Sequence, residues 1–327
     1  MTPSLSQKSS LYRELGQLLK AGKPLPASMQ LLHSATRGAV RELTAMVKAA
    51  LDRGATAGEA FAEQYPVVSH LEASIIGAGA RSGRLDQGCK YLSEYYAGLD
   101  SARKAVIRKM LYPIFLLHFT AFIGALPQLV TTGDFAAYFK SSAGVLIVIY
   151  LCCAVPGFVA SMVLFEGARV TGVDRFLRMI PVYGRMRRAF ALSRFCATYE
   201  MQLDSGVNVM DSLTAAARTS QSALVKEVID RAVPQVRAGS QVGPLLAGTE
   251  AFTPDMVRTI LVGEETGNLD EELKRMAHEF DADARWQLDL LGGIFSKGIY
   301  IMIMVYTGYI IISGYTGYFK VLDSLGS

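Results

Sequence analysis

Three segments of the chain are apolar throughout and carry no Asp, Glu, Lys or Arg. They run over residues 110–133, 141–165 and 298–319, and contain 24, 25 and 22 residues. A helix needs about 20 residues to cross a hydrocarbon core roughly 30 Å thick, and there every backbone polar group must be satisfied internally. The pattern therefore predicts transmembrane helices over residues 110–133, 141–165 and 294–319.

Outside these segments, apolar residues recur at helical spacing. Leu11, Leu15 and Leu18 lie on one face of a predicted helix, and no stretch alternates apolar and polar residues convincingly as a half-buried strand would. We therefore expect helical bundles at residues 1–109 and 166–293. The predicted fold class is an all-α integral membrane protein with three transmembrane helices.

The two polar segments repeat each other at an offset of 184 residues. This offset superposes Gly22 on Gly206 and Gly83 on Gly267, where glycines are expected to end helices. It also carries the first span onto the third. Aligning Pro66 with Pro254, however, requires a gap of a few residues. We predict two copies of a unit made of a bundle and one span. The unpaired second span returns the chain, so that both bundles face the same side.

Composition agrees with this hybrid architecture. The chain is 51% hydrophobic and has 62 charged residues among 327. Outside the three runs the charged share rises to about 24%, close to the roughly 25% of globular domains. Cys89 and Cys196 fall in the bundles, and Cys152 and Cys153 in the second span. No disulfide framework is therefore expected.

Basic residues gather beside the spans. They flank the first span on its N-terminal side and follow the second. Asp174 is the one acid between Arg169 and Arg194, and the loop at 134–140 carries only Asp134 and Lys140. Cytoplasmic flanks hold the excess of Lys and Arg, so we expect both bundles in the cytoplasm, with the loop and the tail at 320–327 outside. The basic residues are Arg103, Lys104, Arg108, Lys109, Arg169, Arg175, Arg178, Arg185, Arg187, Arg188 and Arg194.

Four short motifs follow one another along the chain. Tyr-Pro opens the first span, Pro-x-x-Gly introduces the second copy, a helix ends at Gly before an aliphatic turn, and Gly-Glu-x-Thr-Gly-x-Leu follows. From about residue 9 to the end of the third span, the chain resembles the secretion protein F family of inner-membrane platforms, shared by type IV pilus assembly and type II secretion. The motif positions, with the first-copy glycines, are Gly22, Gly83, Tyr112, Pro113, Pro181, Gly184, Gly206, Gly263, Gly267 and Leu269.

The resemblance implies a non-enzymatic platform in the bacterial inner membrane, with a cytoplasmic N-terminus and a periplasmic C-terminus. It implies as partners a cytoplasmic hexameric ATPase, the transmembrane helices of pilins or pseudopilins, other inner-membrane assembly proteins and further copies of the chain, all within the lipid bilayer. ATPase motion would displace the bundles while the spans guide a pilin out of the bilayer. The compact length is similar to the type IVb pilus branch. The first copy departs from the family pattern, with Ala80 where Glu is expected.

Two charged groups are candidate partner-binding surfaces. Arg185, Arg187 and Arg188 could bind anionic lipid or an acidic face of a motor, or act only as a topology signal. An acidic group could dock a basic partner, hold a cation or form a solvated helix face. It includes Glu264, Glu265, Asp270 and Glu271. Nucleic acid is not expected, because residues 166–297 carry 16 basic and 18 acidic side chains.

No arrangement of residues indicates an enzyme. Gly77–Gly83 lacks the Gly-Lys-Ser/Thr ending of a phosphate loop, and no catalytic triad or metal-ligand spacing is present, so neither cofactor nor metal is expected. His118 in the first span could relay protons or hydrogen-bond a neighbouring helix. Small-residue pairs at Gly157–Ser161 and Ser313–Gly317 favour close helix packing. A membrane-tethered adaptor scaffold and a small oligomeric transporter or channel stay open as alternatives.

Overall fold

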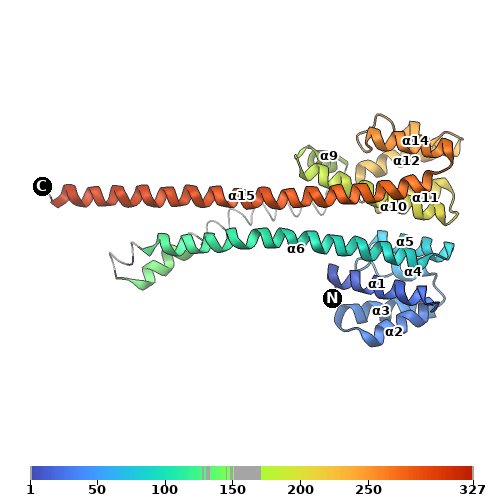
Figure 1. Cartoon of the computed structure of the whole chain (residues 1–327), viewed down its shortest axis with the longest axis horizontal. Coiled ribbons are helices and arrows are strands. Elements are labelled where there is room, and N and C mark those ends of the chain that lie inside the picture. Colours follow the sequence, from blue (N-terminus) through green and yellow to red (C-terminus); the bar gives the residue numbers. More distant parts are fainter. Residues whose placement is uncertain are drawn as a thin grey trace. The chain divides into compact units, whose positions relative to one another are not determined.

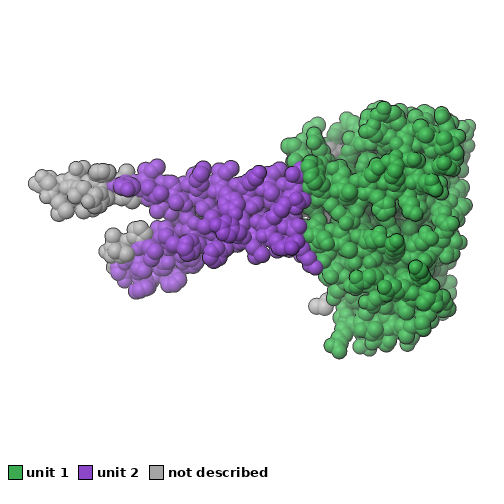
Figure 2. All heavy atoms as spheres, viewed as in Figure 1, with its two compact units in different colours: residues 1–102, 167–288 green, residues 103–166, 289–327 purple. Residues whose placement is uncertain are grey.

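The computed structural model describes residues 2–126, 133–144 and 171–325, together with Leu129, residues 146–147 and Tyr150. Within these ranges every regular element is a helix (Figure 1), which confirms the all-α prediction. The chain divides into two compact units (Figure 2). One comprises residues 1–102 and 167–288, and the other comprises residues 103–166 and 289–327.

The first unit contains both copies of the repeat. The first copy has α1 (Leu5–Lys20), α2 (Leu25–Ala35), α3 (Gly38–Asp52), α4 (Ala57–Ala62), α5 (His70–Ser82) and the start of α6 (Leu85–Gly124). The second has α9 (Thr171–Met179), α10 (Tyr183–Asp204), α11 (Val209–Thr219), α12 (Ala223–Arg237), α13 (Val242–Leu246), α14 (Pro254–Thr266) and the start of α15 (Leu269–Leu325).

The register of the repeat is kept to within one residue. From α2 and α11 to α6 and α15, matching helices begin 184 or 185 residues apart. The gap expected near the prolines was wrong. Pro254 takes the first position of α14, where its fixed φ suits a helix start, whereas Pro66 lies ahead of Ser69, the cap of α5. The two prolines are therefore not equivalent. The offset changes by a single residue, rather than by the few that aligning these prolines would require.

Helix ends follow the chemistry of the local sequence. Gly83 and Gly267 close α5 and α14 in the left-handed conformation, with φ of 72° and 74°, which confirms them as helix stops. The Asn208 side chain, at the start of α11, accepts the N–H of Asp211 at 2.9 Å, as an N-cap residue does. Capping boxes begin three helices of the first copy, formed by Ser4 with Gln7, Thr56 with Glu59, and Ser69 with Glu72.

Each copy has its own apolar core. Tyr12 and Phe61 are fully buried in the first core, and Phe195 and Tyr199 in the second. Tyr91, on α6, packs against both cores. The two bundles are therefore separately cored bodies held side by side within one unit.

Polar contacts join the two copies. Arg84, between α5 and α6, donates to both carboxylate oxygens of Asp204 on α10 at 2.6 Å. Ser205 Oγ donates to the Ala78 carbonyl at 2.8 Å. Both Arg84 bonds come from the same guanidinium nitrogen, Nη1. Because a charge-assisted hydrogen bond is stronger than a neutral one, these contacts tie one bundle to the other.

The last helix of each bundle continues into an apolar segment. Helix α6 extends without interruption over Leu85–Gly124 and α15 over Leu269–Leu325, so positions 109 and 293, expected as domain boundaries, are not helix boundaries. Both helices are long and apolar enough to cross a membrane, and their apolar windows are only 17% and 11% buried. A core helix of a soluble domain would be mostly buried.

The segment expected as a loop between the first two spans is largely helical. Residues 135–144 form a helix, and the Asp134 carboxylate accepts the Ala136 N–H at its start, at 2.8 Å, as a capping side chain does. Residues 320–325, expected as a tail, continue α15. Most of the predicted second span, including the Gly157–Ser161 pair, lies outside the described residues.

Candidate partner-binding surfaces

The structure separates the three candidate arginines. Arg187 Nε donates to Asp174 at 3.0 Å with its side chain only 13% exposed. Arg188 donates to the Phe252 carbonyl at 2.5 Å, and burial lowers the pKa of its guanidinium. Arg185 is exposed. Two of the three therefore make contacts within the bundle, and Arg185 alone of them is freely presented to a partner.

Asp174 is a structural residue whose contacts the sequence did not predict. Its fully buried carboxylate accepts the Ser222 hydroxyl at 2.6 Å and the Leu224 N–H at 3.3 Å, in addition to Arg187. These bonds fasten α9 to the start of α12. The available signal was a single acid within a basic run, because a buried carboxylate requires nearby donors.

Glu264 caps a helix within its own bundle. Its two carboxylate oxygens accept the N–H groups of Val242 and Gly243, each at 2.9 Å. Those amides open α13, and Gln241 before them makes no side-chain cap bond. A carboxylate at a helix N-terminus is stabilising. Partner binding by Glu264 stays a prediction, and its carboxylate is already engaged in capping α13.

In the first copy, the equivalent short helix is capped by its own residues. This helix, α4, begins at Thr56, whose hydroxyl accepts the Glu59 N–H while the Glu59 carboxylate accepts the Thr56 N–H at 2.9 Å. The Thr56 bonds lower the pKa of Glu59. The helix carries its own cap, so Ala80 can replace the glutamate of the family motif without leaving α4 uncapped.

The remaining acids of the candidate group stand nearer solvent. Glu265 and Glu271 are exposed and Asp270 is half-buried. Arg275 pairs with Glu272 and with Glu279, both at 2.6 Å. Within the described residues no three His, Cys, Asp or Glu side chains gather closely enough to hold a metal ion. Glu265 and Glu271 are therefore the residues of this group most available to a partner.

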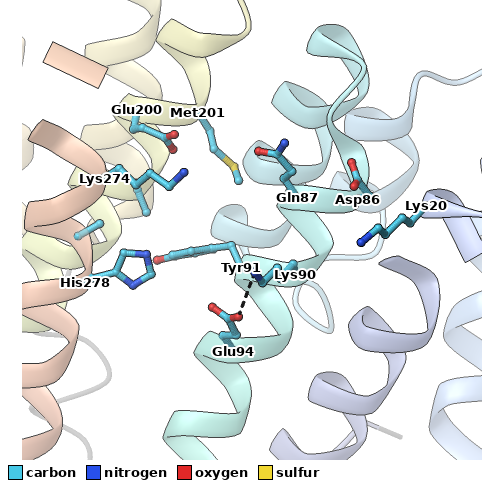
Figure 3. A pocket seen from close by; sticks show the side chains of 12 residues that line it. Lys20, Asp86, Gln87, Lys90, Tyr91, Glu94, Glu200, Met201, Lys274 and His278 are labelled. Carbon is cyan, nitrogen blue, oxygen red and sulfur yellow. Dashed lines mark ion pairs between the residues drawn. The ribbon is translucent and has the colours of Figure 1, made fainter. Parts of the chain in front are cut away.

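A cleft of about 450 Å³ lies between the two copies (Figure 3). Sequence reasoning missed it, because its walls come from helices more than 100 residues apart. It holds side chains of both charges, so it does not select a ligand of one sign. The charged side chains and histidine that line it are Lys20, Asp86, Lys90, Glu94, Glu200, Lys274 and His278.

Glu200 is the most perturbed acid in this cleft. Burial raises its pKa to about 7, Lys274 and Arg84 oppose that rise, and Asp204 and Asp270 add to it. Desolvation disfavours a carboxylate unless a cation compensates fully. The joint between the copies therefore contains a group that changes charge near neutral pH.

The family-motif glycines allow two close helix approaches. A Cβ on Gly263 would lie 3.0 Å from the Leu269 Cα, and one on Gly79 would lie 3.0 Å from the Leu85 Cα. Each glycine lets the helix before the sharp turn touch the start of the helix after it. Gly184, in the Pro181 motif, is also buried. The motif positions are thus explained by packing.

The apolar part of α6 packs through a few polar contacts. Lys109 pairs with Asp289 of α15 at 2.5 Å, and Tyr112, beside Pro113, has its ring 6.0 Å from that of Tyr300. His118 hydrogen-bonds Tyr150 through Nε2 at 2.9 Å and the Ile114 carbonyl through Nδ1 at 2.7 Å. These partners favour helix packing over a proton relay.

Comparison with known proteins gives this architecture a context. The family model described as type II secretion system protein F matches residues 11–130 and again residues 195–319, which confirms the duplication. The chain is 25% identical to the type IV pilus assembly protein PilC of Thermus thermophilus, over 99% of the chain and 84% of that protein. It is 26% identical to the type II secretion system protein F of Vibrio cholerae, over 91% and 77%.

Pilus proteins and secretion proteins both appear among the relatives. A third, the type IV pilus assembly protein PilC of Myxococcus xanthus, is 24% identical over 91% of the chain and 75% of that protein. The type IVb assignment stays a prediction. Because the family model covers most of the chain, in two copies, the chain belongs to the type II secretion system protein F family, the inner-membrane platform proteins of type IV pilus and type II secretion machinery.

Proposed function

We propose that this platform transmits force from a cytoplasmic hexameric ATPase to the transmembrane helices of pilins or pseudopilins. Both bundles face the cytoplasm in this proposal, and the C-terminus is periplasmic. Further copies of the chain and other inner-membrane assembly proteins complete the machine. Family membership supports the membrane platform, and the charge bias beside the spans supports the orientation.

The continuity of α6 and α15 is the observation that carries the proposal. Each helix contributes to a bundle core, through Leu92 in α6 and Leu273 in α15, and runs on into an apolar segment without a break. An α-helix is hydrogen-bonded along its length. At Pro113, which lacks an N–H, Ser296 Oγ on α15 donates to the freed Lys109 carbonyl of α6 at 3.3 Å. Displacement of a bundle would therefore be passed to its span.

The bundles and the apolar segments that α6 and α15 join expose different kinds of side chain. At the bundle, Arg185, Glu265 and Glu271 are exposed and offer charged contacts to a motor. Along the apolar segments, large side chains such as Phe115 and Met304 are exposed. Unpartnered apolar faces suit lipid or another transmembrane helix. The arrangement matches a coupling element better than a catalyst.

Photocrosslinking in cells tests the motor contact and the orientation together. A photoreactive amino acid replaces Glu265 or Arg185, and the captured partner is identified by mass spectrometry. Capture of a hexameric ATPase at either position is the expected result. The control probe replaces Asp134, which the charge bias places in the periplasm. It should capture no cytoplasmic protein.

Two results would count against the proposal. Well-inserted protein that captures only lipid or itself at both bundle positions would remove the motor contact. Capture of the ATPase from position 134 would reverse the orientation.

A further inference from the structure

Helix α9 has two faces of different character. Asp174 and Leu177 are buried, and the helix packs against α10 and α12. Phe176 is 64% exposed and Met179 73% exposed, and Ile180, just beyond the helix, is 40% exposed. Three large apolar side chains so close together on a charged bundle indicate an interaction surface rather than scattered exposure.

Arginines border this apolar face. Arg185 is exposed, and Arg175 is exposed while pairing with Glu250 at 2.9 Å. Arg175, Met179, Arg185 and Glu250 line one shallow depression of about 260 Å³. Phe and Met side chains beside guanidinium groups form the pattern of a helix that lies in a membrane interface.

Asp174 holds the helix so that this face stays outward. Its carboxylate is bonded to Arg187 and Ser222, both of which belong to the bundle, and it is fully buried. The apolar edge cannot turn inward without breaking those bonds and leaving an unpaired charge, which is costly. The exposure of Phe176 and Met179 is thus fixed by the fold.

Chain connectivity limits where α9 can lie. The predicted second span ends at residue 165, and α9 begins at Thr171, so five residues join them. An extended chain covers at most about 3.3–3.6 Å per residue, or roughly 20 Å over this connection. The helix must therefore start within reach of the headgroup layer, on the side where basic residues are concentrated.

We propose that the exposed face of α9 inserts into the headgroup layer of an anionic bilayer. Phe176, Met179 and Ile180 enter the boundary with the acyl chains, and Arg175 and Arg185 lie at phosphate level. This contact holds the second bundle at the membrane surface. The proposal rests on the membrane location of the family. It assigns Arg185 to lipid, so the ATPase contact would then be made through Glu265 and Glu271.

The full-length protein in lipid nanodiscs provides the test. Trp286, the single tryptophan, is changed to Phe, and Phe176→Trp places the probe on α9. The nanodiscs contain phosphatidylglycerol with phosphatidylcholine that is either plain or brominated at carbons 6 and 7 of one acyl chain. Because an interfacial helix buries its apolar face about 5–10 Å deep, brominated lipid should reduce the emission roughly two-fold.

A matched probe distinguishes insertion from simple exposure. Val262 on α14 is 56% exposed, and Val262→Trp in the same background should be quenched by aqueous iodide but not by brominated lipid. If the α9 probe behaves like this control, the proposal is wrong. A probe shielded from both quenchers would also overturn it, because protein rather than lipid would then cover α9.

The lipid charge is tested separately. Quenching of the α9 probe should weaken in pure phosphatidylcholine and with Arg185→Gln. Equal quenching in the charged and uncharged discs would overturn the anionic preference. Failure of any of these tests would leave an ATPase crosslink from Glu265 intact, so the two proposals fail independently.

Discussion

At the scale of single residues, the first bundle contains a buried ion pair at positions whose equivalents in the second bundle are apolar. Lys8 Nζ donates to both carboxylate oxygens of Glu72, at 3.0 and 2.8 Å, and to the Val67 carbonyl at 2.6 Å. The Tyr12 hydroxyl donates to the same carboxylate at 2.6 Å. Burial and the Glu72 charge raise the pKa of Tyr12, so it stays a donor. The charges are compensated entirely within the bundle.

The duplication shows what else the fold accepts at these positions. The offset of 184 places Leu192, Cys196 and Met256 where the first copy has Lys8, Tyr12 and Glu72, and all three are buried in the second core. The same packing is thus built without charge. Replacing a complete buried ion pair by apolar residues is often neutral, whereas removing one partner is strongly destabilising.

This contrast gives a prediction for the first bundle. Lys8→Leu alone should lower the free energy of unfolding by about 3–5 kcal/mol, because Glu72 keeps a buried charge. Adding Glu72→Met and Tyr12→Phe, which remove that charge and the stranded hydroxyl, should restore most of the lost stability. The remaining deficit should be about 1 kcal/mol, because the Ser69 N–H loses its bond to the Glu72 carboxylate. Thermal unfolding in detergent micelles, followed by circular dichroism, measures both. A triple variant as unstable as the single one would contradict this account.

Glu200 predicts a pH dependence at the joint between the copies. Its pKa rises from 4.5 to about 7 on folding, so the folded state binds the proton more tightly than the unfolded chain does. This stabilisation is fully present below about pH 4.5 and is lost as the pH rises through about 7. Between pH 5 and 8 the free energy of unfolding of the native protein should therefore fall more than that of Glu200→Gln, by an amount on the order of one to a few kcal/mol. Denaturant unfolding at each pH measures both. Parallel pH profiles would refute the assignment.

At the scale of elements, α13 depends on a cap from another helix. Glu264→Ala leaves the Val242 and Gly243 amides without their acceptor, and should cost about 1–3 kcal/mol. The effect should be local, so hydrogen exchange read by mass spectrometry should speed up over residues 242–246. Glu265→Ala, one position along α14 and exposed, is the matched control and should change stability by less than about 0.5 kcal/mol. Equal exchange in the two variants would rule out the cap.

The elements also show what the sequence could and could not predict. Gly83 and Gly267 were informative because a left-handed helix end favours glycine wherever the chain goes next. Glu264 was misleading, since its acceptor function depends on amides 21 and 22 residues away, beyond any local pattern. The last charged residue before the first span marks where the bilayer is expected to begin. Helix α6 continues past this position, because a change from charged to apolar side chains does not end a helix.

At the scale of the whole molecule, equivalent helices lead out of the two bundles. The bundles are tied by Arg84 and Asp204, and each passes into the apolar part of the chain through one helix, α6 or α15. A motor that moves one bundle should therefore displace both helices. If force is transmitted in this way, the stiffness of α6 between its core residues and its apolar segment is essential, whereas the identity of the side chains there is not.

Glycine substitutions test this requirement. Ser101, Ala102 and Ala105 lie in α6 outside the bundle core, and changing all three to Gly should weaken the helix locally by about 3 kcal/mol relative to Ala. The charges that orient the span, Arg103 and Lys104, stay in place. We expect normal expression, membrane insertion and ATPase crosslinking, but a several-fold loss of filament assembly or secretion in cells carrying the complete machinery. Ser101→Ala, which keeps α6 stiff, should assemble normally. Normal assembly by the triple glycine variant would show that the bundles do not drive the spans through α6, and would leave the platform as a passive scaffold.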